Sequence, residues 1–141
     1  MPVLRVVSVR DPYGYWASTF KFAWECESSG NGCSQMGTTL RGAGKLSALR
    51  GGFASFMRSM AEDTHRLSQS ERVATACGRP CEYDVALHTE TLQADWNALM
   101  ARLGAPLNAM PRINSGRIPE GAWGPPPPIQ WTSELRRLVY Q

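Results

Sequence analysis

The stretch VLRVVSVRDPYGYWASTFKFAW, residues 3–24, decides the fold of this chain. Its first part, residues 3–9, is mostly β-branched and aliphatic, a pattern typical of a buried strand. Asp11 can cap a following helix, and Pro12 suits the first helical position because an N–H there would have no helical partner. Large aromatic residues then recur at helical spacing, as core residues do: Trp16, Phe20 and Trp24. The stretch therefore predicts a strand that leads directly into a packed helix.

The next segments alternate between irregular and helical patterns. Residues 26–44 are rich in Gly and Ser and are expected to form a loop. Residues 45–76 are expected to be helical, with a break at Gly51 and Gly52. Their apolar positions recur in steps of three and four: Leu46, Leu49, Phe53, Phe56, Met57, Met60 and Leu67. The opposite face is expected to be solvated because it carries arginines: Arg50, Arg58, Arg66 and Arg72.

The second half repeats the strand-to-helix pattern. Residues 83–87 predict a short strand, and the helix after it is capped by Gly104. One face of that helix is apolar: Leu92, Trp96, Leu99, Met100 and Leu103. Residues 105–130 are expected to be irregular and include four consecutive prolines, which form a stiff surface spacer. Thr132 is expected to cap a last helix, which continues to the end of the chain.

Composition excludes several classes of protein. The chain has 141 residues, of which 43% are hydrophobic and 19% charged, which is the balance of one globular domain and not of a disordered chain. The net charge of +3 is too small to predict a nucleic-acid-binding face. No apolar run is long enough for a transmembrane helix, and the N-terminus lacks the pattern of a signal peptide. We expect a single α/β domain over residues 1–141.

The cysteines leave alternatives open: Cys26, Cys33, Cys77 and Cys81. The first pair has the spacing C-x6-C, which lies outside the range of tight structural zinc sites, so no metal is expected. Four unconnected thiols are the interpretation we favour. Two disulfides in an oxidising compartment are the alternative.

Arg10 and Ser18 are the candidate ligand-binding residues. Arg10 stands where the first strand ends, and ligands of open α/β sheets bind at the carboxyl ends of strands. Ser18 lies two helical turns beyond Asp11 and so faces roughly the same side. A guanidinium, a hydroxyl and the free N–H groups of a helix start can together hold a phosphate. The alternative is that Arg10 is a structural or solvated residue.

Residues 7–20, VSVRDPYGYWASTF, resemble the 3′-phosphate-binding motif of sulfotransferases that use 3′-phosphoadenosine-5′-phosphosulfate (PAPS). That motif is a hydrophobic strand, Arg-Asp-Pro, and a serine eight positions after the arginine. The matching residues are Arg10, Asp11, Pro12 and Ser18. The family often has a second arginine, and here Tyr15 takes its place. The resemblance implies that Arg10 and Ser18 bind the 3′-phosphate of PAPS, or of its product 3′-phosphoadenosine-5′-phosphate (PAP).

Later segments resemble Golgi carbohydrate sulfotransferases of the chondroitin and dermatan type. Residues 77–104 share with that family a cysteine pair, Tyr-Asp, a hydrophobic strand, Glu-Thr-Leu and an aspartate. The matching residues are Cys77, Cys81, Tyr83, Asp84, Glu90, Thr91, Leu92 and Asp95. Residues 110–116 resemble the family's Asn-Ser stretch, and residues 131–141 resemble its final helix. The resemblance implies a partial P-loop-like α/β fold, in which helices flank a small parallel sheet.

The function that the resemblance implies is sulfuryl transfer from PAPS to a carbohydrate hydroxyl, without a metal. In the family, a loop that holds the 5′-phosphosulfate precedes the Arg-Asp-Pro motif, as the catalytic base often does. Only nine residues precede Arg10, so we expect the chain to be incomplete at its N-terminus. Residues 35–45 resemble such a loop only superficially, and His65 is expected to be a solvated residue and not a base. His88 is assigned no role, and the base stays unassigned.

Two other functions stay open. A non-catalytic remnant of the sulfotransferase fold would act as a nucleotide- or partner-binding module, and an oligomer could cover its apolar sheet edge. A plain α/β structural domain would share the motifs by chance. The acceptor sugar and the oligomeric state do not follow from the sequence, and a location in the Golgi lumen follows only from the resemblance.

Overall fold

The computed structural model describes residues 3–30, 45–62, 82–110 and 121–140. These residues form helices and one two-stranded parallel sheet, which confirms a mixed α/β class. The chain divides into two compact units, and each is described by itself. Unit 1 comprises residues 1–11 and 67–115, and unit 2 comprises residues 12–66 and 116–141. The expected single domain over residues 1–141 stays a prediction.

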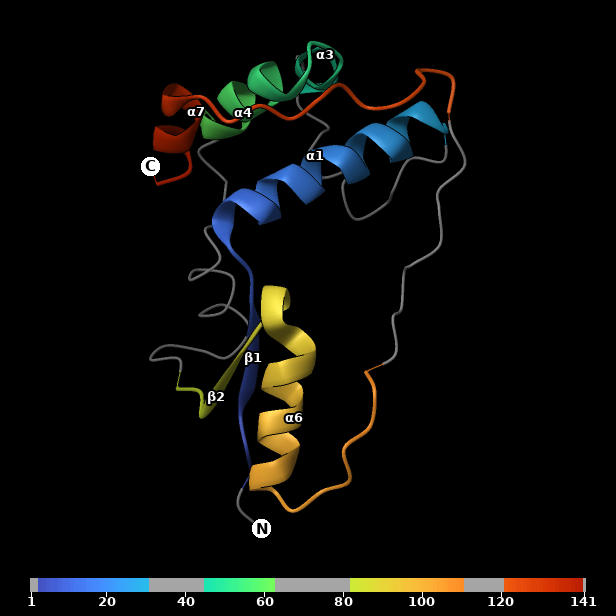
Figure 1. Ribbon diagram of the computed structural model, residues 1–141. Helices are drawn as coiled ribbons and strands as arrows, with labels where there is room; N and C mark the ends of the chain where they lie inside the picture. The colour runs from blue at the N-terminus through green and yellow to red at the C-terminus, as the bar shows by residue number, and fades with distance from the viewer. Residues whose placement is uncertain (1–2, 31–44, 63–81, 111–120, 141) are drawn as a thin grey trace. The chain divides into compact units, whose positions relative to one another are not determined.

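Unit 1 is built on the parallel pair of β1 (Val6–Val9) and β2 (Val85–His88) (Figure 1). Val6 pairs with Val85 and Val9 with His88, so both strands end at the same edge. The short 3₁₀ helix η1 (Thr89–Thr91) and then α6 (Leu92–Arg102) follow β2, and α6 packs back against that strand. Parallel strands in the predicted chain order are thus confirmed.

Asp84 fixes the point at which the two strands begin to pair. Its Oδ2 accepts the backbone N–H of Arg5 at 2.8 Å, and its own N–H donates to the Arg5 carbonyl at 2.9 Å. The strand predicted over residues 3–9 therefore starts only at Val6. The prediction that it is buried is wrong, because exposed and half-buried residues alternate along β1. Such an alternation is typical of a sheet that is covered on one face.

The end of α6 confirms the predicted cap at Gly104. Gly104 has a φ of +64° and donates to the Ala101 carbonyl at 3.2 Å, while Ala105 donates to the Met100 carbonyl at 2.9 Å. This pair of bonds is the Schellman arrangement. Leu103 was expected on the apolar face but is 55% exposed, because the helix has already ended there.

Unit 2 consists of α1 (Pro12–Ser28), α3 (Lys45–Arg50), α4 (Phe53–Ala61) and α7 (Ser133–Leu138). Helix α1 begins at Pro12 as predicted and runs two residues beyond the predicted start of the loop. Gly52, with a φ of +96°, separates α3 from α4, which confirms the predicted break. The predicted helix beyond residue 62 and the predicted loop over residues 31–44 lie outside the described residues.

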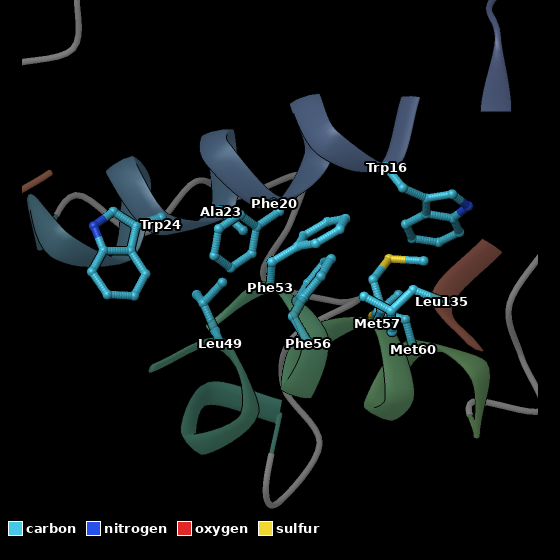
Figure 2. Close-up of a cluster of buried hydrophobic side chains, with 10 residues drawn as sticks. All are labelled: Trp16, Phe20, Ala23, Trp24, Leu49, Phe53, Phe56, Met57, Met60 and Leu135. Carbon is cyan, nitrogen blue, oxygen red and sulfur yellow. The ribbon is translucent and has the colours of Figure 1, made fainter. Parts of the chain in front are cut away.

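The core of unit 2 is an aromatic cluster between α1 and α4 (Figure 2). The ring of Phe20 lies 5.4 Å from the Phe53 ring and 5.5 Å from the Phe56 ring, measured between centroids. The buried residues of the cluster come from four helices: Trp16, Phe20, Ala23, Trp24, Leu49, Phe53, Phe56, Met57, Met60 and Leu135. The prediction that Leu46 belongs to the apolar face is wrong. Leu46 is 43% exposed, because Leu49 alone of the short α3 faces the core.

The irregular segment before α7 packs on the C-terminal end of α1. The backbone N–H of Ala122 donates to the Ser28 carbonyl, and the N–H of Trp123 donates to Ser28 Oγ, both at 2.9 Å. A side chain at Gly121 would overlap the Ser28 backbone, so only glycine allows this approach. The indole N–H of Trp24 donates to the Gly124 carbonyl at 3.0 Å. These hydrogen bonds hold residues 121–124 against the C-terminal end of α1.

The last helix confirms its predicted start and corrects its end. The Thr132 side chain accepts the backbone N–H of Leu135 at 3.2 Å, as a capping residue does. Helix α7 ends at Leu138, with Val139 as its C-cap, so it does not continue to the end of the chain as expected.

None of the described helices is both long and apolar enough to cross a membrane.

Cys26 overturns the interpretation of four unconnected thiols. It is buried in α1 and takes part in a disulfide. Spacing along the chain could not predict this, because a disulfide depends on which cysteines the fold brings together. The other cysteines lie outside the described residues.

Candidate functional site

The candidate site is the edge of unit 1 at which β1 and β2 both end. Because the strands are parallel and Val9 pairs with His88, the residues that follow each strand emerge side by side. Arg10 and Asp11 follow β1, and the 3₁₀ helix η1 follows β2. We call this group the carboxyl edge: Arg10, Asp11, His88, Thr89, Glu90, Thr91 and Asp95.

Two hydrogen bonds tie the ends of the two strands together. Oε1 of Glu90 accepts the backbone N–H of Asp11 at 2.8 Å. The Thr89 hydroxyl donates to the Val9 carbonyl at 2.9 Å. The side chains after β2 thus satisfy backbone groups that the end of the β1 ladder leaves without a strand partner. Arg-Asp-Pro and Thr-Glu-Thr are therefore in direct contact, although 79 residues separate Asp11 from Glu90.

His88 and Asp95 form a hydrogen-bonded pair beside these bonds. Nδ1 of His88 lies 2.9 Å from Oδ2 of Asp95, and the same oxygen accepts the His88 backbone N–H at 2.7 Å. The Thr91 hydroxyl donates to Oδ1 of Asp95 at 3.1 Å. The pKa of Asp95 lies below its ordinary value. The main cause is the hydrogen bond from the backbone N–H of His88, and the second is the hydrogen bond with the His88 ring. Asp95 is therefore ionised at neutral pH.

The predicted phosphate-binding residues fall in different units. Arg10 is half-buried directly after β1, in unit 1. Ser18 is half-buried in α1, in unit 2. The structure thus places Arg10 at the carboxyl edge, whereas Ser18 belongs to the other unit.

The residues of the carboxyl edge carry charges of both signs. Arg10 contributes a guanidinium, and carboxylates stand at Asp11, Glu90 and Asp95. Within the described ranges, no group of three or more His, Cys, Asp and Glu side chains is arranged to hold a metal ion. The edge therefore carries hydrogen-bond acceptors, the guanidinium of Arg10 and the imidazole of His88.

Sequence reasoning missed the pairing of His88 with Asp95. It noted His88 without a role and Asp95 only as a member of a motif. A signal was present, because a strand-terminal histidine precedes by seven residues an aspartate in the first turn of a helix. Other residues considered in the sequence lie outside the described ranges: His65, residues 35–44, Asn114 and Ser115.

Comparisons with protein-family models, with curated proteins and with solved structures each returned no match. Within unit 1, two segments that carry the sulfotransferase resemblance, the Arg-Asp-Pro and Glu-Thr-Leu motifs, are in contact through Asp11 and Glu90. Any assignment of function therefore starts from those motifs and from the chemistry of the carboxyl edge.

Proposed function

We propose that this chain is a sulfotransferase-like protein that transfers a sulfuryl group from PAPS to a carbohydrate hydroxyl. One observation carries the proposal. Parallel pairing of β1 with β2 joins the Arg-Asp-Pro and Glu-Thr-Leu motifs through the bond between Glu90 and Asp11. Two motifs that resemble one family, far apart in the sequence, belong to one strand edge, which is where α/β folds bind ligands.

The nucleotide contacts that we propose are those of Arg10 and Ser18 with the 3′-phosphate. Arginine suits this role because its planar guanidinium donates two parallel hydrogen bonds to a phosphate. The Ser18 hydroxyl would add one donor. Both assignments come from the motif resemblance.

The reaction that we propose is an in-line displacement at sulfur and uses no metal. Negative charge develops on the leaving phosphate, so hydrogen-bond donors aimed at that group would lower the barrier. The disulfide at Cys26 supports the proposal that the protein works in an oxidising compartment, because disulfides persist there. The Golgi lumen that the resemblance suggests is such a compartment.

The test is calorimetric titration of the full chain with PAP. Because a charge-assisted bidentate contact contributes about 1.5–3 kcal/mol, we expect Arg10→Ala to weaken PAP binding by about 10- to 100-fold. Ser18→Ala should weaken it less, since a neutral hydrogen bond is lost. Arg5→Ala is the matched control, because Arg5 precedes the same strand and pairs with Glu82 at 3.4 Å. Folded wild type that does not bind PAP would reject the nucleotide site.

A second candidate is a non-catalytic module that binds a partner or its own copy. Exposed apolar side chains just before β1 and at its first residue favour it: Val3, Leu4 and Val6. Exposed apolar residues gathered at a sheet edge are typical of surfaces that another chain covers. Light scattering separates the two functions: a self-associating chain without transfer activity supports the module, and a monomer with sulfuryl transfer rejects it.

A further inference from the structure

The imidazole of His88 is held in one orientation at the carboxyl end of β2. Asp95 Oδ2 lies 2.9 Å from the ring nitrogen Nδ1 and accepts the backbone N–H of the same residue at 2.7 Å. Asp95 Oδ1 accepts the Thr91 hydroxyl at 3.1 Å. The carboxylate is thus anchored from the strand end and from the residue before α6. An anchored carboxylate fixes both the position of the ring and its tautomer.

This pairing determines which ring nitrogen can take a proton. An ionised carboxylate only accepts hydrogen bonds, so Nδ1 of the neutral ring carries the hydrogen and Nε2 keeps its lone pair. Among the described residues, no further hydrogen bond reaches the His88 ring. The His88 side chain is 58% exposed, whereas that of Asp95 is 25% exposed. The geometry is therefore that of an accessible proton acceptor backed by a less exposed carboxylate.

We propose that Nε2 of His88 is the general base for the carbohydrate hydroxyl and that Asp95 positions its ring, an inference that rests on the proposed function. The acceptor oxygen forms a bond to the sulfur of PAPS. The bond from sulfur to the bridging phosphate oxygen breaks, and its electron pair leaves with PAP. The proton of the acceptor hydroxyl passes to Nε2, and the adjacent carboxylate stabilises the imidazolium that results.

Among the described residues, four other charged side chains directly follow β1 or stand in η1 and the first turn of α6: Arg10, Asp11, Glu90 and Asp95. Three of them are less suited to this role. The Arg10 guanidinium has no lone pair to offer. Glu90 holds the Asp11 N–H at 2.8 Å. The lowered pKa of Asp95 makes its carboxylate a poor proton acceptor.

The first test reads the tautomer directly. The chain has two histidines, so nitrogen-15 spectra of wild type and of His65→Gln assign both rings. We expect the hydrogen of neutral His88 on Nδ1 in wild type. Asp95→Asn should shift the balance toward a hydrogen on Nε2, because an amide oxygen holds the Nδ1 hydrogen less strongly than a carboxylate. A hydrogen on Nε2 of neutral wild type would overturn the proposal.

The second test measures transfer from PAPS to a panel of desulfated glycosaminoglycans by the full chain. Because general-base catalysis contributes about 100-fold or more, His88→Ala should lower kcat by at least that factor and leave PAP affinity unchanged. Added imidazole should restore part of the rate to His88→Ala. Asp95→Asn should lower kcat by a smaller factor, and His65→Gln serves as the matched control.

The outcomes separate this inference from the function on which it rests. Transfer that persists undiminished in His88→Ala, with PAP binding intact, overturns the general base and leaves the sulfotransferase function standing. Wild type that neither binds PAP nor transfers sulfate overturns both. Loss of rate together with loss of PAP affinity in His88→Ala would make His88 a nucleotide-binding residue and overturn its role as base.

Discussion

At the scale of single residues, the exposed pair of Arg58 and Glu134 joins α4 to α7. Nε of Arg58 lies 2.8 Å from Oε1 of Glu134, and Nη2 of Arg58 lies 3.0 Å from Oε2, so the contact is bidentate. The hydrogen bond from Arg58 is the main cause that lowers the pKa of Glu134 below its ordinary value of 4.5. Arg137 lowers it too, as the smallest of the causes. The two arginines therefore form a matched pair for substitution.

We predict that Arg58→Gln raises the pKa of Glu134 toward its ordinary value and that Arg137→Gln raises it less. A carboxyl whose pKa is lowered by folding contributes stability above its unfolded-state pKa and loses it as pH falls through the folded-state pKa. The difference in unfolding free energy between wild type and Arg58→Gln should therefore be largest above about pH 5 and vanish in acid. Carbon-13 titration of the Glu134 carboxyl and urea unfolding at several pH values measure both effects. Equal shifts in the two variants would contradict the bidentate contact.

At the scale of elements, α6 shows a stop signal that acts through the backbone alone. Gly104 has a φ of +64°, and a Cβ placed there meets nothing within 4 Å. Any penalty for a side chain at this position is therefore conformational and not steric crowding by other residues.

We predict that Gly104→Ala lowers the free energy of unfolding by about 1 kcal/mol, whereas Gly104→Asn lowers it less because asparagine tolerates positive φ. Urea denaturation measures the difference, and hydrogen exchange at the Ala105 amide tests whether the bond to the Met100 carbonyl survives. An alanine variant as stable as wild type would mean that α6 ends without this cap.

The elements also show which features a sequence can predict. The start of α1 at Pro12 and the end of α6 at Gly104 were predicted because each is a local choice of backbone angles by one residue. The exposure of β1 was not predicted, because a run of valines has the same sequence pattern whether one face of the strand is covered or both. The contact between Glu90 and Asp11 depends on pairing across 79 residues. Periodicity carries no information about such partners.

At the scale of the whole molecule, each unit has its own means of stabilisation. Unit 2 buries an aromatic cluster that its sequence spacing predicted, with Phe20 and Phe56 fully enclosed. In unit 1, Leu87 and Leu99 are the buried residues among those that the structure describes. Its strands are tied together by hydrogen bonds that the Asp84 and Glu90 carboxylates accept and that the Thr89 hydroxyl donates. The sequence predicted that Arg10 stands at a strand end, but the hydrogen bonds among the residues that follow β1 and β2 became visible only in three dimensions.

The disulfide at Cys26 adds a covalent constraint, and we predict that the oxidised chain is the more stable form. Closing a loop restricts the unfolded chain, so a native disulfide contributes about 2–4 kcal/mol. Cys26→Ser should lower the free energy of unfolding by that order, and reduction of wild type should lower it similarly. Urea denaturation with and without reductant measures this, and peptide mapping after alkylation under denaturing, non-reducing conditions shows whether Cys26 is protected. Alkylation of Cys26 without reductant would contradict the bond. It would also remove the observation that supports the proposed oxidising compartment, while leaving the nucleotide and His88 experiments unaffected.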